Sequence, residues 1–212
     1  MRFPVRSGSA LLVAIVLMAC SSGGGTTPTP IAASSAAPAV SSQASIIATE
    51  DPRMSQPPPS AASAAFTLTS TAFGEGGAIP SEFSCDGANV SPPLSWAGVP
   101  AGAASLVLVV DDPDARGFVH WIVLDLPGTD GTLPEGVAPT AATPQQGRAD
   151  FGDVGWGGPC PPSGTHHYRF TLTAIAAPLG LSGQPSGEDV AAALAAANVL
   201  GQAILTGTYR RA

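Results

Sequence analysis

The pattern of apolar and polar positions predicts several β-strands in the second part of the chain. Residues 105–110 form a continuous apolar run between turn-forming residues, which is typical of a strand buried on both faces. Residues 119–126 form a second strong apolar run, which ends at a Pro-Gly pair. Residues 168–175 alternate, so that one face of a strand would be aromatic and aliphatic and the other polar. Two weaker runs predict further short strands, at residues 66–70 and 203–209.

The period of the pattern changes towards the C-terminal end, where a helix is predicted. Ser186 and Asp189 have the spacing of a capping box. The alanine-rich run that follows, to about Leu200, has a high helix propensity. Three of its side chains would share one apolar face, namely Val190, Leu194 and Ala197. The predicted fold class is therefore mainly β, with one or a few helices.

Residues 1–20 have the pattern of an export signal. Arg2 and Arg6 precede an apolar run at 10–19 that is too short to span a bilayer. The run ends at Cys20 in a Leu-Met-Ala-Cys sequence that resembles the lipobox of bacterial lipoproteins, whose cysteine is lipidated. We therefore expect an exported envelope protein that is anchored to a membrane by a lipid on Cys20. An ordinary signal peptide with a chance cysteine is the alternative.

A polar segment separates this signal from the rest of the chain. Residues 21–64 consist mainly of Ser, Ala, Thr, Pro and Gly, and they carry only three charged side chains. Such a segment cannot bury enough apolar surface to offset its ordering entropy, so we expect a disordered linker. The remaining residues, 65–212, have the length of one ordinary domain.

The charge balance and the cysteines narrow the possible partners. The chain has 8 basic residues, no lysine and 15 acidic residues, which give a net charge of −7. Without a basic stripe, neither nucleic acid nor an anionic membrane surface is an expected partner. Apart from Cys20, the cysteines are Cys85 and Cys160. In an exported protein they can form a disulfide or remain two separate buried thiols.

Two segments of the chain are candidates for a functional site, and the first, rich in carboxylate and imidazole side chains, follows the buried run at 105–110. It contains Asp112, Asp114 and, a few residues later, His120. If the two strands flanking this segment are neighbours, His120 lies close to the carboxylates. A carboxylate beside an imidazole raises the pKa of the histidine, and a cationic histidine can receive an anion.

The second segment, 155–162, is rich in glycine and proline and leads to His166. Gly157 and Gly158 would let backbone N–H groups face a ligand, as in an anion-binding nest. His166 is in phase with Tyr168 on the alternating strand, whereas His167 points to the opposite face. Together the two segments suit a small pocket for a phosphate-like group on an organic body.

Residues 65–212 resemble the phosphatidylethanolamine-binding protein family, in particular its bacterial branch, often called Raf-kinase-inhibitor-like. The resemblance is carried by four motifs in order, at residues 83–96, 111–121, 155–168 and 205–210. It implies a β-sandwich-like fold with a C-terminal helix and a surface pocket for phosphate or phospholipid headgroups. Family members bind ligands and inhibit kinases or proteases, and no catalytic activity or cofactor is settled for them. The ligand-binding residues that the resemblance implies are Asp112, Asp114, His120, Trp156, Gly157, Gly158 and His166.

Three departures from the family pattern concern the rim of this pocket. Arg116 stands where the family usually has proline, and His167 stands where it usually has arginine. The connection from Ala115 to His120 is also shorter than usual. These differences imply a lower and more basic rim, which leaves the identity of the ligand open.

Two other classes of function remain open at this stage. The same Asp and His side chains could act as acid and base or hold a metal ion in a hydrolase. However, the chain has neither an HExxH motif nor a Gly-x-Ser-x-Gly motif, so we expect no enzyme and no metal site. An inhibitor that contacts an envelope protease or kinase through an exposed loop is the other alternative.

The lipid anchor predicted at Cys20 can be tested directly. Cys20→Ser removes the thiol that would be lipidated, so the variant should move from the membrane fraction to the soluble fraction of cells. Immunoblotting of both fractions measures the change. A variant that stays in the membrane fraction as fully as the unmodified chain would contradict the lipoprotein interpretation.

Overall fold

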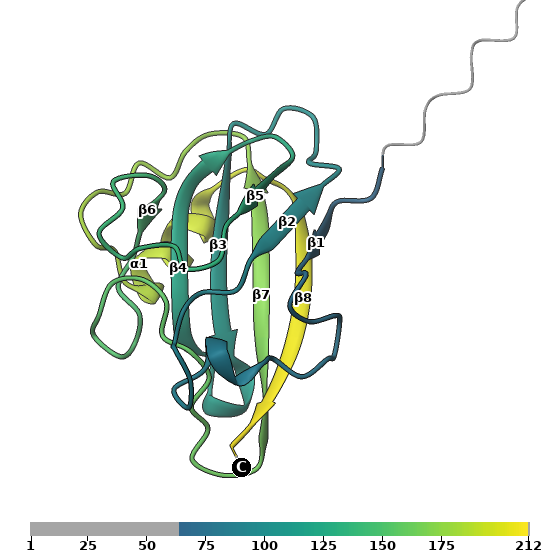
Figure 1. Cartoon of the computed structure of the whole chain (residues 1–212). Helices are drawn as coiled ribbons and strands as arrows, with labels where there is room; N and C mark the ends of the chain where they lie inside the picture. The colour runs from purple at the N-terminus through teal and green to yellow at the C-terminus, as the bar shows by residue number, and fades with distance from the viewer. Residues whose placement is uncertain (1–63, 212) are drawn as a thin grey trace, which may run out of the picture. The chain divides into compact units, whose positions relative to one another are not determined.

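The computed structural model describes residues 64–211, and their strands form two antiparallel sheets (Figure 1). The smaller sheet has the order β1 (Thr67–Thr69), β2 (Leu94–Ala97) and β5 (Gly131–Leu133). The larger sheet has the order β6 (Gln145–Gln146), β4 (Phe118–Pro127), β3 (Ser105–Asp112), β7 (Thr165–Ile175) and β8 (Val199–Arg210). The predicted signal peptide, Cys20 and the linker up to residue 63 lie outside the described residues.

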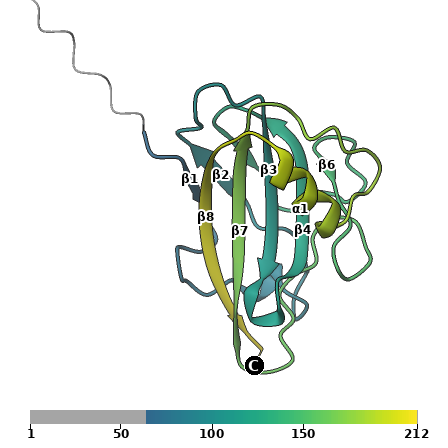
Figure 2. The same ribbon diagram turned by 180° about the vertical axis from the view of Figure 1, so that it is seen from behind.

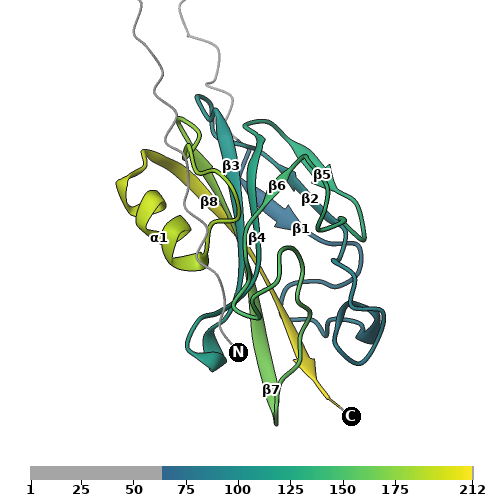
Figure 3. The same cartoon turned by 90° about the vertical axis from the view of Figure 1, so that its left-hand side faces the viewer.

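The larger sheet is covered on both faces, which explains the continuous apolar run at 105–110. One face packs against the smaller sheet and the other against helix α1 (Gly187–Ala196), as Figures 2 and 3 show. Leu106, Leu108 and Val110 belong to the core between the sheets. Val107 belongs instead to a second cluster, which it forms with Val190 of α1 and other side chains. Alternate residues of β3 therefore enter two different cores, and the mainly β prediction is confirmed.

The start of α1 agrees with the sequence prediction. The Ser186 hydroxyl accepts a hydrogen bond from the Asp189 N–H at 3.2 Å, and the Asp189 carboxylate accepts one from the Ser186 N–H at 2.8 Å. These reciprocal bonds satisfy two N–H groups that the first turn of a helix would otherwise leave unpaired. Within residues 64–211, no helix has both the length and the hydropathy needed to cross a bilayer.

The end of α1 differs from the prediction, because the helix stops at Ala196 and not near Leu200. The chain then enters β8, which begins at Val199 and is longer than the predicted 203–209 strand. Val199 pairs with Ile175 of β7, and the Ala176 N–H donates to the Asn198 carbonyl at 3.0 Å. Hydrogen bonding along the whole of β7 outweighs the helix propensity of this segment.

The connection between β3 and β4 is a tight turn. Residues Pro113–Ala115 form a 3-10 helix, in which the Ala115 N–H donates a hydrogen bond to the Asp112 side chain. Arg116 and Gly117 follow in the left-handed region, with φ of 63° and 78°. β4 then starts at Phe118, directly opposite Asp112. The short connection that distinguishes this sequence is therefore built from two successive left-handed residues.

The capping box generates a stability prediction. Ser186→Ala removes the acceptor for the Asp189 N–H and should lower the free energy of unfolding by about 1 kcal/mol. Urea unfolding followed by circular dichroism measures the change. The matched control is Ser182→Ala, because Ser182 is exposed and lies before the helix. Equal stability of the two variants would show that the box does not hold the start of α1.

Candidate functional site

The candidate site lies at the end of the larger sheet where β3 ends and β7 begins, towards the C-terminus in Figure 1. A cavity of about 220 Å³ opens there, which we call the histidine cavity. Its walls come from β4, β7, the β3–β4 turn and two loops. They are formed by Asp112, Ala115, Phe118, His120, Phe151, Cys160, Pro161, Pro162, His166 and Tyr168.

Asp112 and His166 form a hydrogen-bonded pair on one wall of this cavity. The His166 Nδ1 donates to Asp112 Oδ2 at 2.7 Å, and the Ala115 N–H donates to Asp112 Oδ1 at 3.1 Å. Asp112 is only 3% exposed, so both oxygens of a buried carboxylate have partners. The pair fixes the His166 ring, and among residues 64–211 its Nε2 has no hydrogen-bond partner.

His120 reaches the cavity from β4 and is 3% exposed. Its Nδ1 lies 2.6 Å from the Gly157 carbonyl oxygen. Because a carbonyl only accepts, this Nδ1 carries the proton and the neutral ring has its lone pair on Nε2. The rings of Phe118, Phe151 and Tyr168 stand edge-on to it, with centroids 5.1–5.3 Å away.

The electrostatics of His120 correct one sequence prediction. The sequence led us to expect a nearby aspartate that raises the pKa of His120. In the structure, burial lowers the pKa of His120, and the Gly157 hydrogen bond and the Asp112 charge oppose this effect only in part. The reason is the strand register. Asp112 lies opposite Phe118, two residues before His120, and its carboxylate bonds to His166 on the other neighbouring strand.

Asp114, which the sequence placed in the pocket, points elsewhere. Its Oδ2 accepts hydrogen bonds from both the N–H and the Nδ1 of His167, each at 2.8 Å. The His167 hydrogen bonds lower the pKa of the Asp114 carboxyl. Both side chains are about half exposed, and neither lines the histidine cavity. Asp114 thus anchors the β3–β4 turn to β7 on the outside of the site.

Asp111 also lies outside the cavity, because successive residues of a strand point to opposite faces of the sheet. It forms a two-pronged ion pair with Arg169, with nitrogen to oxygen distances of 3.0 and 2.6 Å. This pair bridges β3 and β7 on the face that α1 covers, where it lines a cavity between helix and sheet.

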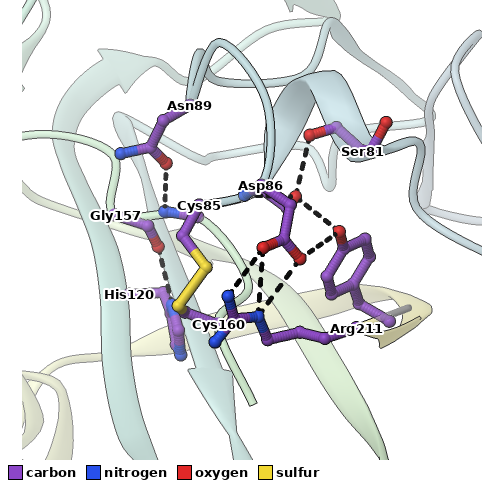
Figure 4. The surroundings of a disulfide bond; sticks show 11 residues. Ser81, Cys85, Asp86, Asn89, His120, Gly157, Cys160 and Arg211 are labelled. Atoms are coloured by element: carbon purple, nitrogen blue, oxygen red, sulfur yellow. Dashed lines mark hydrogen bonds and ion pairs between the residues drawn. A yellow bond between two sulfur atoms is a disulfide. The ribbon is translucent and has the colours of Figure 1, made fainter. Parts of the chain in front are cut away.

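Hydrogen bonds and a disulfide connect the glycine-rich loop at 155–162 to other segments of the chain (Figure 4). Its amides are already used, because the Gly157 N–H donates to the His120 carbonyl at 2.9 Å and the Gly158 N–H to Asn89 Oδ1 at 2.8 Å. The predicted nest of free N–H groups is therefore not formed by these two residues. Gly158 is needed for close packing, since a side chain there would collide with the carbonyl of Phe83.

A disulfide joins this loop to the 81–89 loop. Cys85 and Cys160 are bonded, with Cα atoms 5.4 Å apart, so the structure selects the first of the two alternatives left by the sequence. The Cys85 N–H also donates to the Pro159 carbonyl at 3.1 Å, and the Trp156 indole N–H to the Phe83 carbonyl at 3.0 Å. The loop that holds His120 in place is consequently rigid.

The predicted residues Trp156, Gly157 and Gly158 line a second cavity, of about 210 Å³, which we call the tryptophan cavity. It shares two wall residues, Phe151 and Cys160, with the histidine cavity. The structure thus brings Asp112, His120 and His166 together and places the glycine-rich loop between this group and a neighbouring hollow.

Tyr168, whose phase with His166 predicted that both side chains face one cavity, lines the histidine cavity and is fully buried. Its hydroxyl has no hydrogen-bond partner among residues 64–211. The sequence did not identify two other wall residues. Phe118 and Phe151 carried no such signal, because nothing in their local sequence distinguishes a wall residue from an ordinary core residue. Among the described residues, no group of three His, Cys, Asp or Glu side chains is placed to hold a metal ion.

Comparison with known proteins adds the family context. The sequence is 46% identical over 149 residues to a UPF0098 protein of Methanothermobacter thermautotrophicus, covering 68% of this chain and 98% of that protein. It is 48% identical over 149 residues to the "Putative lipoprotein LppC" of Mycobacterium tuberculosis, covering 68% and 71%. The crystal structure of YbcL from E. coli, described as a member of the mammalian PEBP family, matches with a TM-score of 0.64 and 34% identity, covering 70% and 100%.

The fold, the order of the motifs and these relatives all point to one family. The sequence pattern of the family described as "Phosphatidylethanolamine-binding protein" matches residues 69–210, which include the larger sheet, the histidine cavity and α1. The chain therefore belongs to the phosphatidylethanolamine-binding protein family.

Proposed function

We propose that the histidine cavity binds the phosphate group of a small organic phosphate or of a phospholipid headgroup, without catalysing a reaction. The observation that carries the proposal is the arrangement of His120 and His166. Each ring is fixed through its Nδ1 by a protein acceptor, so each Nε2 is the nitrogen that remains for a ligand. Two oriented imidazoles on one small cavity suit an anion with several oxygen atoms.

The unpartnered hydroxyl of Tyr168 supports the same conclusion. A fully buried hydroxyl without a partner costs free energy, and a ligand oxygen in the cavity would satisfy it. Burial raises the pKa of Tyr168, and the nearby Cys160 backbone opposes this rise only in part, so the hydroxyl keeps its proton. That proton has no acceptor among residues 64–211 and can be donated to a ligand oxygen. Tyr168 would thus supply a neutral donor between the two histidines.

The charge of Asp112 does not oppose this function. Both of its oxygens already accept hydrogen bonds from protein donors, namely the Ala115 N–H and the His166 Nδ1, so neither oxygen is left unpaired towards an anion. The net charge of the chain is negative, but the groups that line the cavity decide the interaction at such short range.

We also propose an envelope location through a lipid on Cys20. The support is the lipobox-like sequence together with the relative that is named a lipoprotein. A tether at Cys20 would hold the domain within reach of phospholipid headgroups, which are one source of the proposed anion.

The lowered pKa of His120 generates a pH prediction. At neutral pH the lowered pKa keeps His120 uncharged, so its Nε2 accepts a hydrogen bond and must gain a proton to donate one. An anion favours that proton, or supplies it as a protonated phosphate. Inorganic phosphate should therefore bind tighter as the pH falls from about 8 to about 6, by roughly tenfold. Isothermal titration calorimetry at several pH values measures this, and a Kd independent of pH would contradict it.

Two adjacent histidines offer a matched pair of variants. His166→Gln removes a ligand contact from the cavity and should weaken phosphate binding by about tenfold or more. His167→Gln changes the same residue type on the exposed face and should leave the Kd nearly unaltered. Equal effects of the two substitutions would place the binding site elsewhere.

A comparison of inorganic phosphate with glycerophosphoethanolamine would distinguish a site for free phosphate from a site for a phospholipid headgroup.

A further inference from the structure

The tryptophan cavity has a composition that the proposed phosphate site does not explain. Its walls include the Trp156 indole, the Phe151 ring and the Cys85–Cys160 disulfide. Asp153 is the only ionisable side chain on them, and it is exposed at the rim. The cavity is thus aromatic and sulfur-lined, and its single charge is negative.

The ring of Phe151 is the wall that divides this cavity from the histidine cavity. It packs 4.8 Å from the Phe118 ring and 5.2 Å from the His120 ring, measured between centroids. It packs against Gly157, where even a methyl group would collide with it. Nevertheless, Phe151 is 49% exposed, so much of the ring remains available to a ligand.

The position of Phe151 is set by hydrogen bonds and not by the ring alone. It occupies a tight turn that the Gly152 N–H closes on the Ala149 carbonyl at 2.9 Å. The adjacent Asp150 fastens this turn to β4, because its N–H donates to the Val119 carbonyl and its carboxylate accepts from the Val119 N–H. The turn that carries Phe151 is therefore fixed to β4, the strand that also carries His120.

Size and charge together define what the second cavity can hold. An apolar cavity of roughly 150 Å³ is enough for one benzene ring, and the tryptophan cavity has about 210 Å³. The Asp153 carboxylate would repel an anion from its rim. A ligand that uses both cavities must therefore place its anionic end beside the histidines and its apolar end beside Trp156.

We propose that the two cavities form one bipartite site for an organic phosphate whose ester group is a single aromatic ring. The phosphate occupies the histidine cavity, the ring passes over Phe151, and its face stacks in the tryptophan cavity. Phe151 is then the residue that determines which ester groups are accepted. This inference rests on the proposed phosphate site and adds the class of ester that the site selects.

The test compares phenyl phosphate with inorganic phosphate on the purified domain. Calorimetry should show that phenyl phosphate binds about tenfold tighter or better, because the ring leaves water. Trp156 serves as an internal reporter, since Trp96 and Trp121 are buried in the core. In NMR spectra, phenyl phosphate should shift both the Trp156 indole and the His166 ring, whereas inorganic phosphate should shift the histidine far more than the indole.

A matched pair of substitutions locates the ring. Asp153→Trp places a bulky side chain at the rim of the tryptophan cavity. It should abolish most of the additional affinity that phenyl phosphate has over inorganic phosphate. Asp153 suits this change because its side chain makes no hydrogen bond within the described part of the chain. Glu135→Trp makes the same change of size and charge at an exposed position that lines neither cavity, and it should retain the gain.

The outcomes separate this inference from the proposed function. If inorganic phosphate binds and shifts His166 but phenyl phosphate binds no tighter, the bipartite site is overturned and the phosphate site stands. The bipartite site is also overturned if phenyl phosphate binds tighter without changing the chemical shift of the Trp156 indole, or if its higher affinity persists in Asp153→Trp. If inorganic phosphate itself fails to bind, the phosphate site is wrong and the bipartite site falls with it.

Discussion

Strand β3 is buried between β4 and β7 with both of its faces covered, and the positions of the site residues follow from this burial. Alternate side chains of β3 pack into the core between the sheets and into the cluster beneath α1. The register of the strand therefore cannot slip, because a shift by one residue would exchange the two sets of side chains. This fixed register places Asp112 at the end of β3 beside His166 of β7, with His120 on the opposite neighbour.

The sheet alone does not make the site rigid, since His120 depends on a loop from a distant part of the sequence. The Gly157 carbonyl accepts a hydrogen bond from the His120 ring, and the Gly157 N–H donates one to the His120 carbonyl. The disulfide and the contacts of Trp156 and Gly158 with the 81–89 loop hold that loop in turn. The cost of this arrangement is that the glycine amides are occupied. Donors for an anion must then come from side chains, namely the two imidazoles and the Tyr168 hydroxyl.

The two histidines occupy different environments although they share one cavity. His166 is bonded to a carboxylate, whereas His120 is surrounded by aromatic rings and bonded to a neutral carbonyl. Burial among those rings lowers the pKa of His120, so this ring accepts a positive charge only together with an anion. His120 therefore adds no buried positive charge before an anion binds, and its ring can gain a proton and donate a hydrogen bond once the phosphate is present.

Local patterns in the sequence determined the strand runs, the capping box at Ser186 and the phase that puts His166 and Tyr168 on one face. These follow from the periods of side chains along strands and helices, which act over only a few residues. The four motifs, in their order along the chain, also indicate the family. Only the tertiary structure decided that Asp112 pairs with His166, that Asp114 turns outward to His167, and that α1 ends at Ala196. Each of these depends on which strands become neighbours and in which register, and that choice is made by packing between residues far apart in the chain.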